Sequence, residues 1–208
     1  MRKGLPVLAV LGVAALVACG SSSTADVSPS PTAGGGSLSS PPKATPTAVA
    51  VSLDPCQLVT SQEASALTGA AYGAGREDQY SGGGKGCVYG YQTLNVFMVI
   101  VAQAADAGTA KAEWTQEQSR AQSALLQLGG SAATVNINFN DVSNLTGADM
   151  AAVGTGIATV SGHTFSASAI YVLKGATFFN FSDLVYGHAA PSVTAMETQA
   201  TTVLGRVP

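Results

Sequence analysis

Charged residues are scarce in this chain of 208 residues: they make up 10% of it, against about 25% in a usual soluble domain. Positive charge is scarcest, because nine Lys and Arg stand against 12 Asp and Glu, and the basic residues beyond position 3 are scattered singly. Binding to a phosphate backbone needs clustered positive charge, so the sequence excludes a nucleic-acid partner. Ser, Thr, Gly, Ala and Gln replace the missing charges and give a largely neutral surface, which suits an envelope protein.

Long apolar runs are missing as well, apart from one run near the N-terminus. Arg2 and Lys3 precede the run LPVLAVLGVAALVA at residues 5–18. A helix of this length spans about 21 Å, less than the hydrocarbon core of a membrane at about 30 Å. The run therefore predicts the apolar region of a signal peptide rather than a membrane-spanning helix. No other stretch approaches the roughly 18 apolar residues that a span needs.

The apolar run ends in Leu16-Val17-Ala18-Cys19, which resembles the lipobox of bacterial lipoproteins. In a lipobox the signal peptide is cut before the cysteine, whose thiolate accepts a diacylglyceryl group with palmitate-type chains. Two or three acyl chains hold a protein far more firmly than one. We therefore expect residues 1–18 to be a lipoprotein signal peptide and Cys19 to anchor the chain at the extracytoplasmic face of the cell membrane. A general secretory signal followed by an unrelated cysteine is the alternative.

Residues 19–53 form a low-complexity stretch of Ser, Thr, Pro, Gly and Ala without an aromatic residue. Such a segment cannot bury enough apolar surface to offset the entropy lost on ordering, so it is expected to be a disordered tether. A flexible chain of this length has a root-mean-square span of about 30–35 Å. The remaining residues, 54–208, have the length of one ordinary domain.

Within residues 54–208 the hydrophobic patterns alternate between helix and strand. Thr60 and Glu63 have the spacing of a capping box, which predicts a short helix that ends at Gly69. Residues 72–86 are rich in glycine and charge and predict a loop or an irregular hairpin. Strand patterns follow at 87–92, 94–102, 135–142, 151–160, 163–173 and 176–185, and helical patterns at 109–128 and after Pro191.

The order of these elements predicts the fold class. The β-branched run at 94–102 predicts a central strand buried on both faces, and Lys174-Gly175 predicts a two-residue hairpin turn. Gly154-x-Gly156 lacks the third glycine of a dinucleotide-binding fingerprint, so it is interpreted as a strand with close backbone packing. Because the C-terminal strands follow one another without intervening helices, we expect an α+β fold: an antiparallel-rich sheet with two to three packed helices.

The chain has only three cysteines, of which Cys19 is assigned to the lipid. Cys56 and Cys87 remain as an even pair in an exported, oxidising setting, which favours a disulfide. Redox pairs prefer the closer C-x-x-C spacing, and a zinc site needs four ligands, whereas the chain holds two histidines. We therefore predict no metal site and no cofactor.

A short motif opens the domain, and its positions are Asp54-Pro55-Cys56-Gln57-Leu58-Val59-Thr60, then Glu63, Gly69 and Gly86-Cys87-Val88-Tyr89. It resembles the DUF3558 lipoproteins of actinobacteria. The resemblance implies a lipobox, a tether, an envelope location and a bridge between the two cysteines of the motif, and it transfers no catalytic residue. The alternation of sheet and helices is also similar to the PsbP/Mog1-like fold of mycobacterial lipoproteins.

Residues that could carry catalysis do not converge in the sequence. The motif G-x-S-x-G of serine hydrolases is absent, and Asp183 is the nearest acid to His188, with His163 on another strand. The pair Glu77-Asp78 could combine with Asp141 in a glycosidase, but adjacent acids in a glycine-rich loop are more often solvated. We predict that the protein is not an enzyme.

Aromatic side chains give a softer indication of a binding surface. Tyr89 and Tyr91 follow the glycine-rich loop, and Phe178, Phe179 and Phe181 lie on the last strand. Side chains alternate along a strand, so that one face belongs to the core and the other is able to line a ligand groove. These five residues are the candidate ligand-lining residues, and a purely structural role in the core is the alternative.

Together these observations favour a non-enzymatic binding or interaction module on the cell surface, held to the membrane by its lipid anchor. The predicted partner is an envelope protein, a glycan or a lipid. Three alternatives remain. A carrier of a hydrophobic small molecule requires a cavity between sheet and helices, and an envelope hydrolase requires a site built on His163 or His188. A purely structural accessory of a larger complex predicts co-purification with a membrane partner and no small ligand.

Overall fold

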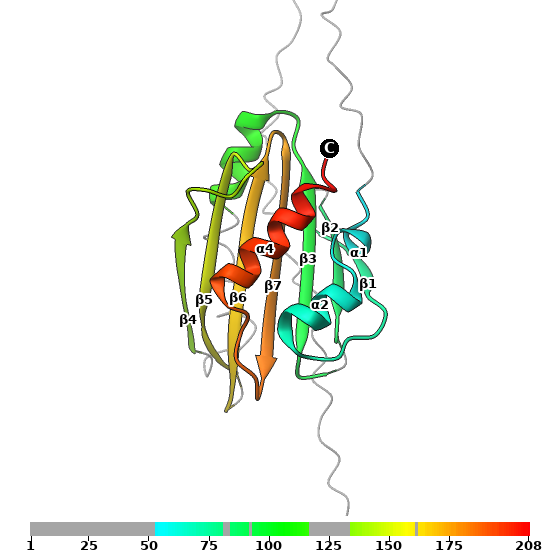
Figure 1. The fold of residues 1–208 in the computed structure, drawn as a ribbon, viewed down its shortest axis with the longest axis vertical. Helices are drawn as coiled ribbons and strands as arrows, with labels where there is room; N and C mark the ends of the chain where they lie inside the picture. Colours follow the sequence, from blue (N-terminus) through cyan, green and yellow to red (C-terminus); the bar gives the residue numbers. More distant parts are fainter. Residues whose placement is uncertain (1–52, 81–83, 92, 117–133, 161) are drawn as a thin grey trace, which may run out of the picture.

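The computed structural model of the protein describes residues 53–80, 84–91, 93–116, 134–160 and 162–208. These residues form an open antiparallel sheet of seven strands with helices packed on it, which confirms the predicted α+β class (Figure 1). The strands are β1 (Arg76–Gln79), β2 (Lys85–Tyr89), β3 (Val96–Gln103), β4 (Thr134–Asp141), β5 (Met150–Val160), β6 (His163–Lys174) and β7 (Thr177–Tyr186).

The strands lie in the order β1-β2-β3-β7-β6-β5-β4. After β3 the chain therefore crosses to the far edge of the sheet, and β4 to β7 return strand by strand until β7 pairs with β3. That pairing runs from Val96 opposite Leu184 to Gln103 opposite Thr177. It joins the N-terminal strands and the C-terminal strands into a single sheet.

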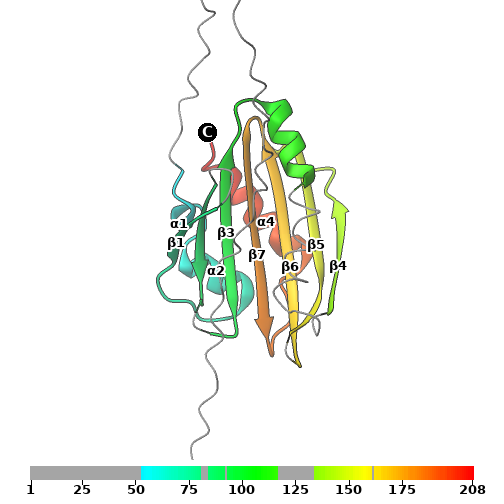
Figure 2. The same ribbon diagram turned by 180° about the vertical axis from the view of Figure 1, so that it is seen from behind.

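Helices cover parts of both faces of the sheet. The front face carries α1 (Pro55–Leu58), α2 (Ser61–Thr68) and α4 (Val193–Leu204), which lie in front of the strands in Figure 1. The opposite, back face carries the helix of residues 107–116, which is seen near the top of Figure 2. The sheet is thus the middle layer of the fold.

Two apolar clusters hold these layers together. The cluster on the front face is built around the buried residues Val99, Ile170, Val172, Phe179, Phe181 and Met196. The cluster on the back face contains Ala110, Trp114, Tyr171, Leu173 and Phe178. Each large side chain buried in this way contributes about 1.5–3 kcal/mol, so the two clusters are a principal source of stability.

The helix ends follow local capping signals. The capping box of Thr60 and Glu63 is confirmed at the start of α2, and Gly69 ends that helix with the left-handed φ of 74°. Helix α1 was not predicted, although a capping residue marks its start. The Asp54 side chain caps α1 by accepting a 2.8 Å hydrogen bond from the N–H of Cys56. Its short length of four residues explains why no hydrophobic period revealed it.

The last helix differs in detail from its prediction. Ser192, rather than Pro191, is the residue next to the helix, and its side chain caps α4 by accepting from the N–H of Ala195. The predicted buried stripe is confirmed for Met196, Ala200, Val203 and Leu204. Val193, predicted on the same stripe, is 40% exposed, because it lies in the first turn.

Of the two alternatives for residues 72–86, the hairpin is confirmed, because β1 lies in this stretch and pairs antiparallel with β2. Two other strand predictions need correction. Strand β3 is fully buried on the front side only, because its back-facing residues are half-buried. The two-residue turn between β6 and β7 consists of Gly175 and Ala176, one position later than predicted, since Lys174 pairs with Thr177.

Close backbone packing at Gly154 and Gly156 is confirmed. Both lie on β5, where a Cβ at Gly154 would come within 2.5 Å of the Phe139 ring. A Cβ at Gly156 would come within 1.9 Å of the Asn136 carbonyl oxygen on β4. The glycines therefore let β4 and its aromatic ring lie against β5.

The helix predicted at 109–128 is described only in part. Residues 107–116 are helical, and Trp114 of the predicted stripe is buried. The stretch 117–128, with the rest of that stripe, lies outside the described residues, as do residues 1–52. Among the residues that the structure describes, no helix combines the length and apolarity that crossing a membrane requires.

The predicted disulfide is confirmed: Cys56 of α1 is bonded to Cys87 of β2, with a Cα–Cα distance of 5.2 Å. The bond closes a loop with a sequence separation of 31 residues. We expect the double substitution Cys56→Ala/Cys87→Ala to lower the free energy of unfolding by about 3–4 kcal/mol, because the unfolded chain regains loop entropy. Guanidinium unfolding followed by tryptophan fluorescence measures this change, and an unchanged midpoint would contradict it.

Candidate functional site

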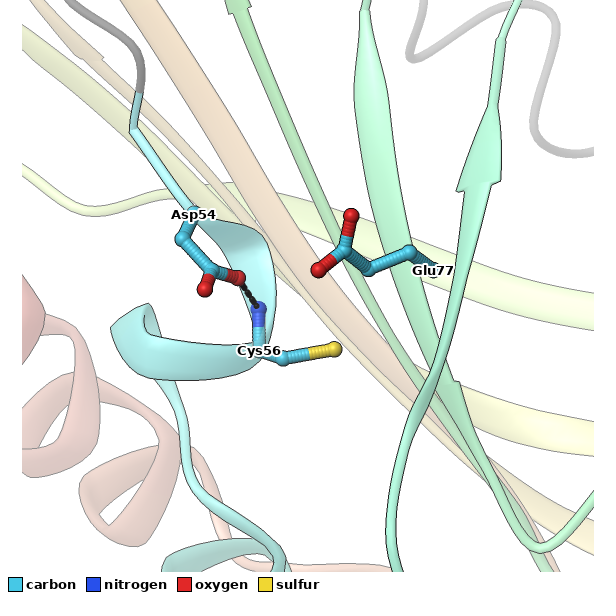
Figure 3. A group of neighbouring side chains, drawn as sticks. All are labelled: Asp54, Cys56 and Glu77. Atoms are coloured by element: carbon cyan, nitrogen blue, oxygen red, sulfur yellow. Dashed lines mark hydrogen bonds between the residues drawn. The ribbon is translucent and has the colours of Figure 1, made fainter.

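An acidic cluster at the entrance to the domain is the first candidate. Atoms of Asp54, Cys56 and Glu77 that could bind a metal lie within 4.8 Å of one another (Figure 3). The sulfur of Cys56 is bonded to Cys87, however, and a disulfide sulfur is not the thiolate that binds metals. Asp54 caps α1, which leaves the exposed Glu77 as the only remaining carboxylate of the group. The cluster is therefore a structural junction.

The candidate ligand-lining aromatics occupy three different places. Tyr89, Phe179 and Phe181 are buried in the front cluster. Phe178 lies in the back cluster, where its ring stacks on Tyr171 with centroids 6.0 Å apart. Tyr91 is 36% exposed in the turn after β2, under the Arg76 guanidinium at 4.9 Å. The structure thus does not bring the five rings together around one groove.

Tyr89 has a clear structural role. Its hydroxyl donates to the carbonyl of Val59 at 2.6 Å and to that of Cys56 at 3.1 Å. Burial raises the pKa of this phenol to about 12, and the charges of Asp54 and Glu63 act in the same direction. Tyr89 therefore stays protonated and fastens the segment around α1 to the sheet.

Neither predicted histidine is part of a catalytic set among the described residues. His163 is exposed at the start of β6 and meets the Tyr186 ring edge-on, with centroids 5.5 Å apart. His188 is exposed after β7, whereas Asp183, the acid considered for it, is buried at 3% exposure. Within the described part of the chain, neither imidazole hydrogen-bonds to a serine or an acid, as a hydrolytic triad requires.

The carboxylates considered for glycoside chemistry lie too far apart in the sheet to act together. Glu77 and Asp78 belong to β1, which forms one edge of the seven-stranded sheet. Asp141 belongs to β4, which forms the other edge. The 5–10 Å separation that glycosidases use, an order-of-magnitude range, is incompatible with opposite edges of such a sheet.

A buried acid, whose burial no sequence pattern indicates, lies under α4. Asp183 of β7 accepts a short hydrogen bond from the hydroxyl of Ser168 on β6, and Ser168 lies 3.5 Å from the sulfur of Met196. The second oxygen of Asp183, Oδ2, has no hydrogen-bond partner among the described residues. Burial raises the pKa of Asp183 to about 7, although the bond from Ser168 opposes the shift.

Tyr72 is the other polar group of this buried region. Its ring packs on Tyr89 and Phe97, each with centroids 6.3 Å apart, and its hydroxyl oxygen is buried. Burial raises the pKa of Tyr72, a side-chain hydrogen bond with Thr68 opposes this shift, and the charge of Asp183 adds to it. Because Asp183 is covered by a helix and surrounded by side chains of the core, it acts as a structural acid with no access for a substrate.

A small depression lies beside α4. It has a volume of about 270 Å³ and is lined by Asp141, Val142, Ser143, Asn144, Leu145 and Glu197. Sites for small organic ligands usually measure about 300–1,000 Å³ and are mostly apolar, so this polar depression does not fit a hydrophobic cargo. The front cluster beneath the helices is packed with side chains that are fully buried.

Among the described residues, a partly exposed cluster of aromatic and aliphatic side chains lies at one end of the back face, and we call it the end patch. It consists of Leu94, His163, Phe165 and Tyr186. Tyr186 is 41% exposed and Leu94 is 44% exposed, whereas Phe165 is half-buried with its ring centroid 5.7 Å from that of Tyr186.

Strand pairing explains why these residues meet. Phe165 lies directly opposite Tyr186 in the ladder between β6 and β7. Continuing the register of β3 and β7 by two residues places Leu94 opposite Tyr186, and the Asn95 side chain fixes this arrangement by accepting from the Tyr186 N–H at 2.7 Å. The end patch is thus held by three strands, although its members are distant in the sequence.

Comparison with known proteins adds no relative. No family model matches the sequence, and no curated protein is significantly similar to it. The resemblance of residues 54–89 to the DUF3558 lipoproteins therefore rests on the motif itself and stays a prediction, as does the lipidation of Cys19, which lies outside the described residues.

The raised pKa of Asp183 predicts how stability depends on pH. The folded chain binds this proton more tightly than the unfolded chain, whose carboxyl has the ordinary pKa of 3.8. The resulting stabilisation is fully present below about pH 4 and is lost as the pH rises through about 7. Asp183→Asn keeps the shape of the side chain but removes the titrating carboxyl group, so its stability relative to the parent should rise by about 2–3 kcal/mol between pH 5 and pH 8.

Urea unfolding of the parent and of Asp183→Asn at both pH values measures this difference. Glu63 provides an internal contrast, because the hydrogen bond from Arg206 lowers its pKa to about 2. Its stabilisation is present above pH 4.5 and is lost as the pH falls, so it does not change between pH 5 and pH 8. A parent–variant difference that is the same at both pH values would show that Asp183 is ionised in the fold.

Proposed function

We propose that this protein is a lipid-anchored interaction module of the bacterial envelope, which catalyses no reaction and binds a partner protein through the end patch. The exposed cluster of Leu94, His163, Phe165 and Tyr186 is the observation that carries this proposal. Contiguous exposed apolar and aromatic side chains on a soluble domain mark interaction sites, and tyrosine is among the residues enriched in binding hot spots.

The chemistry of the end patch favours a protein over the other predicted partners. It offers rings and an aliphatic side chain but few hydrogen-bonding groups, whereas a glycan needs polar groups to satisfy its hydroxyls. A carried lipid needs an enclosed apolar cavity, and the packed front cluster supports no such space among the described residues.

The position of the end patch suits an anchored domain. The C-terminal end of the fold is held at the opposite end of the sheet, where Lys174 of β6 donates to the carbonyl of Val207 at 2.6 Å. A tether of about 30–35 Å between the predicted lipid at Cys19 and Asp54 lifts the whole domain away from the bilayer. The end patch is then free to meet a second envelope protein.

Site-specific photocrosslinking in a bacterium that exports the full chain tests the end patch. A photoreactive residue at Tyr186 should give one discrete protein adduct, and Leu94→Ser should reduce the yield of that adduct by at least about tenfold, since the two side chains form one contact surface. A photoreactive residue at Thr198, exposed on α4 of the front face, is the matched control. The same adduct at Thr198, or an unchanged yield in Leu94→Ser, would refute the proposed surface.

The anchor is tested by mass spectrometry of the mature N-terminus. We expect the mature chain to begin at Cys19 with a diacylglyceryl thioether, and to partition into the membrane fraction. Cys19→Ala should remove the lipid mass and the membrane retention that depends on it. A mature chain that begins at another residue, or that carries a free thiol at Cys19, would show that the signal is an ordinary secretory one.

A further inference from the structure

The two sulfurs of the disulfide have different surroundings. Cys87 is fully buried, with 0% of its surface exposed, whereas Cys56 is half-buried. The backbone of Gly75 lies directly against Cys87, because a Cβ at Gly75 would overlap the Cys87 sulfur and the Tyr89 ring. A thiolate that reduces a disulfide has to attack one of the two sulfurs directly. The sulfur of Cys56 is therefore the one that a thiolate from solution reaches.

Two carboxylates lie beside this reachable sulfur. One oxygen of Asp54 and one of Glu77 lie within 4.8 Å of the Cys56 sulfur and of each other. They come from different elements, because Asp54 is the cap of α1 and Glu77 lies on β1, directly opposite Cys87 (Figure 3). Both side chains are exposed, so neither charge is there to satisfy the core.

The cations of the β1–β2 hairpin are placed away from these two carboxylates. The side chain of Arg76 lies on the opposite face from that of Glu77, because neighbouring side chains alternate along a strand. Arg76 also pairs with Asp78 at 3.4 Å. Lys85 lies on the same face as Glu77, but it is two residues along β2 from Cys87, a distance of about 7 Å. An anion that approaches the disulfide thus meets two negative charges at short range.

We propose that Asp54 and Glu77 form an electrostatic guard of the disulfide, which slows its reduction by small anionic thiols. In this reduction a thiolate attacks the Cys56 sulfur, the bond to Cys87 breaks, and Cys87 leaves with the electron pair as a thiolate. A second thiolate then attacks the reagent sulfur of the mixed disulfide and releases Cys56 as a thiolate. The protein disulfide gains the two electrons that the two reagent thiolates lose when they form their own disulfide.

Both the incoming and the leaving thiolate are disfavoured at this disulfide. The carboxylates of Asp54 and Glu77 repel the incoming thiolate at short range. The leaving thiolate forms at Cys87, which is fully buried, and burial disfavours a charge. Capping alone does not require a charge at Asp54, because asparagine and serine cap a helix as well as aspartate does. The guard supplies the reason for a carboxylate at this position and keeps α1 bonded to β2.

Reduction of the full chain by two thiols of similar size and opposite charge tests the guard. The thiols are mercaptoethanesulfonate, an anion, and cysteamine, a cation, and each rate is divided by that of the same thiol with a small uncharged disulfide. At low ionic strength the parent should react at least about threefold more slowly with the anionic thiol, and salt should narrow this difference. Alkylation followed by peptide mass spectrometry measures the reduction and shows which cysteine carries the first mixed disulfide, which should be Cys56.

Neutral, isosteric variants identify the residues responsible. Asp54→Asn/Glu77→Gln should speed reduction by the anionic thiol about five- to tenfold and remove most of the difference between the two thiols. Glu113→Gln, which removes an exposed charge from the helix of residues 107–116 on the back face, is the matched control for Glu77→Gln and should change neither rate. A variant that merely loosens the fold would speed both thiols equally and leave their ratio unchanged. An unchanged ratio in the double variant, an equal effect of Glu113→Gln, or a first mixed disulfide on Cys87 would overturn the proposal.

Discussion

The pairing of β3 with β7 is the constraint on which the rest of the fold depends. Three strands and the helix of residues 107–116 intervene between these two strands, so closing the ladder costs loop entropy that its own contacts must offset. Val99 opposite Phe181 supplies part of the front cluster. The same ladder places Asp183 opposite Phe97, and its extension places Leu94 beside Tyr186. The front cluster, the buried position of Asp183 and the end patch thus all depend on the pairing of β3 with β7.

The segment before the sheet is held by bonds to other parts of the molecule, because helices as short as α1 and α2 are not stable alone. The disulfide to Cys87 fastens α1 covalently to β2. Arg206, which follows α4, donates to the carbonyl of Leu58 at 2.6 Å and forms an ion pair with Glu63. A pull on the chain at Asp54 would therefore reach the sheet through the Cys56–Cys87 bond as well as through the helices.

Sequence periodicity predicted most of the strands and the last helix because these patterns are local. Strand β1 escaped because a charged edge strand has no apolar alternation to reveal it. The order of the strands depends on the contact between β3 and β7, which no local pattern encodes. The burial of Asp183 was also not predictable, because a solvated acid and a buried acid look the same in a sequence. Asp183 lies between Phe181 and Val185, which are buried on the same face of β7. This position indicates that Asp183 is buried only when the strand and its buried face are already known.

The low charge of the chain makes the position of each described charge informative. Glu63 and Arg206 join the two ends of the domain, and Lys174 binds the carbonyl groups at the end of α4, where a helix dipole favours a cation. The charges of β1 protect one edge of the sheet.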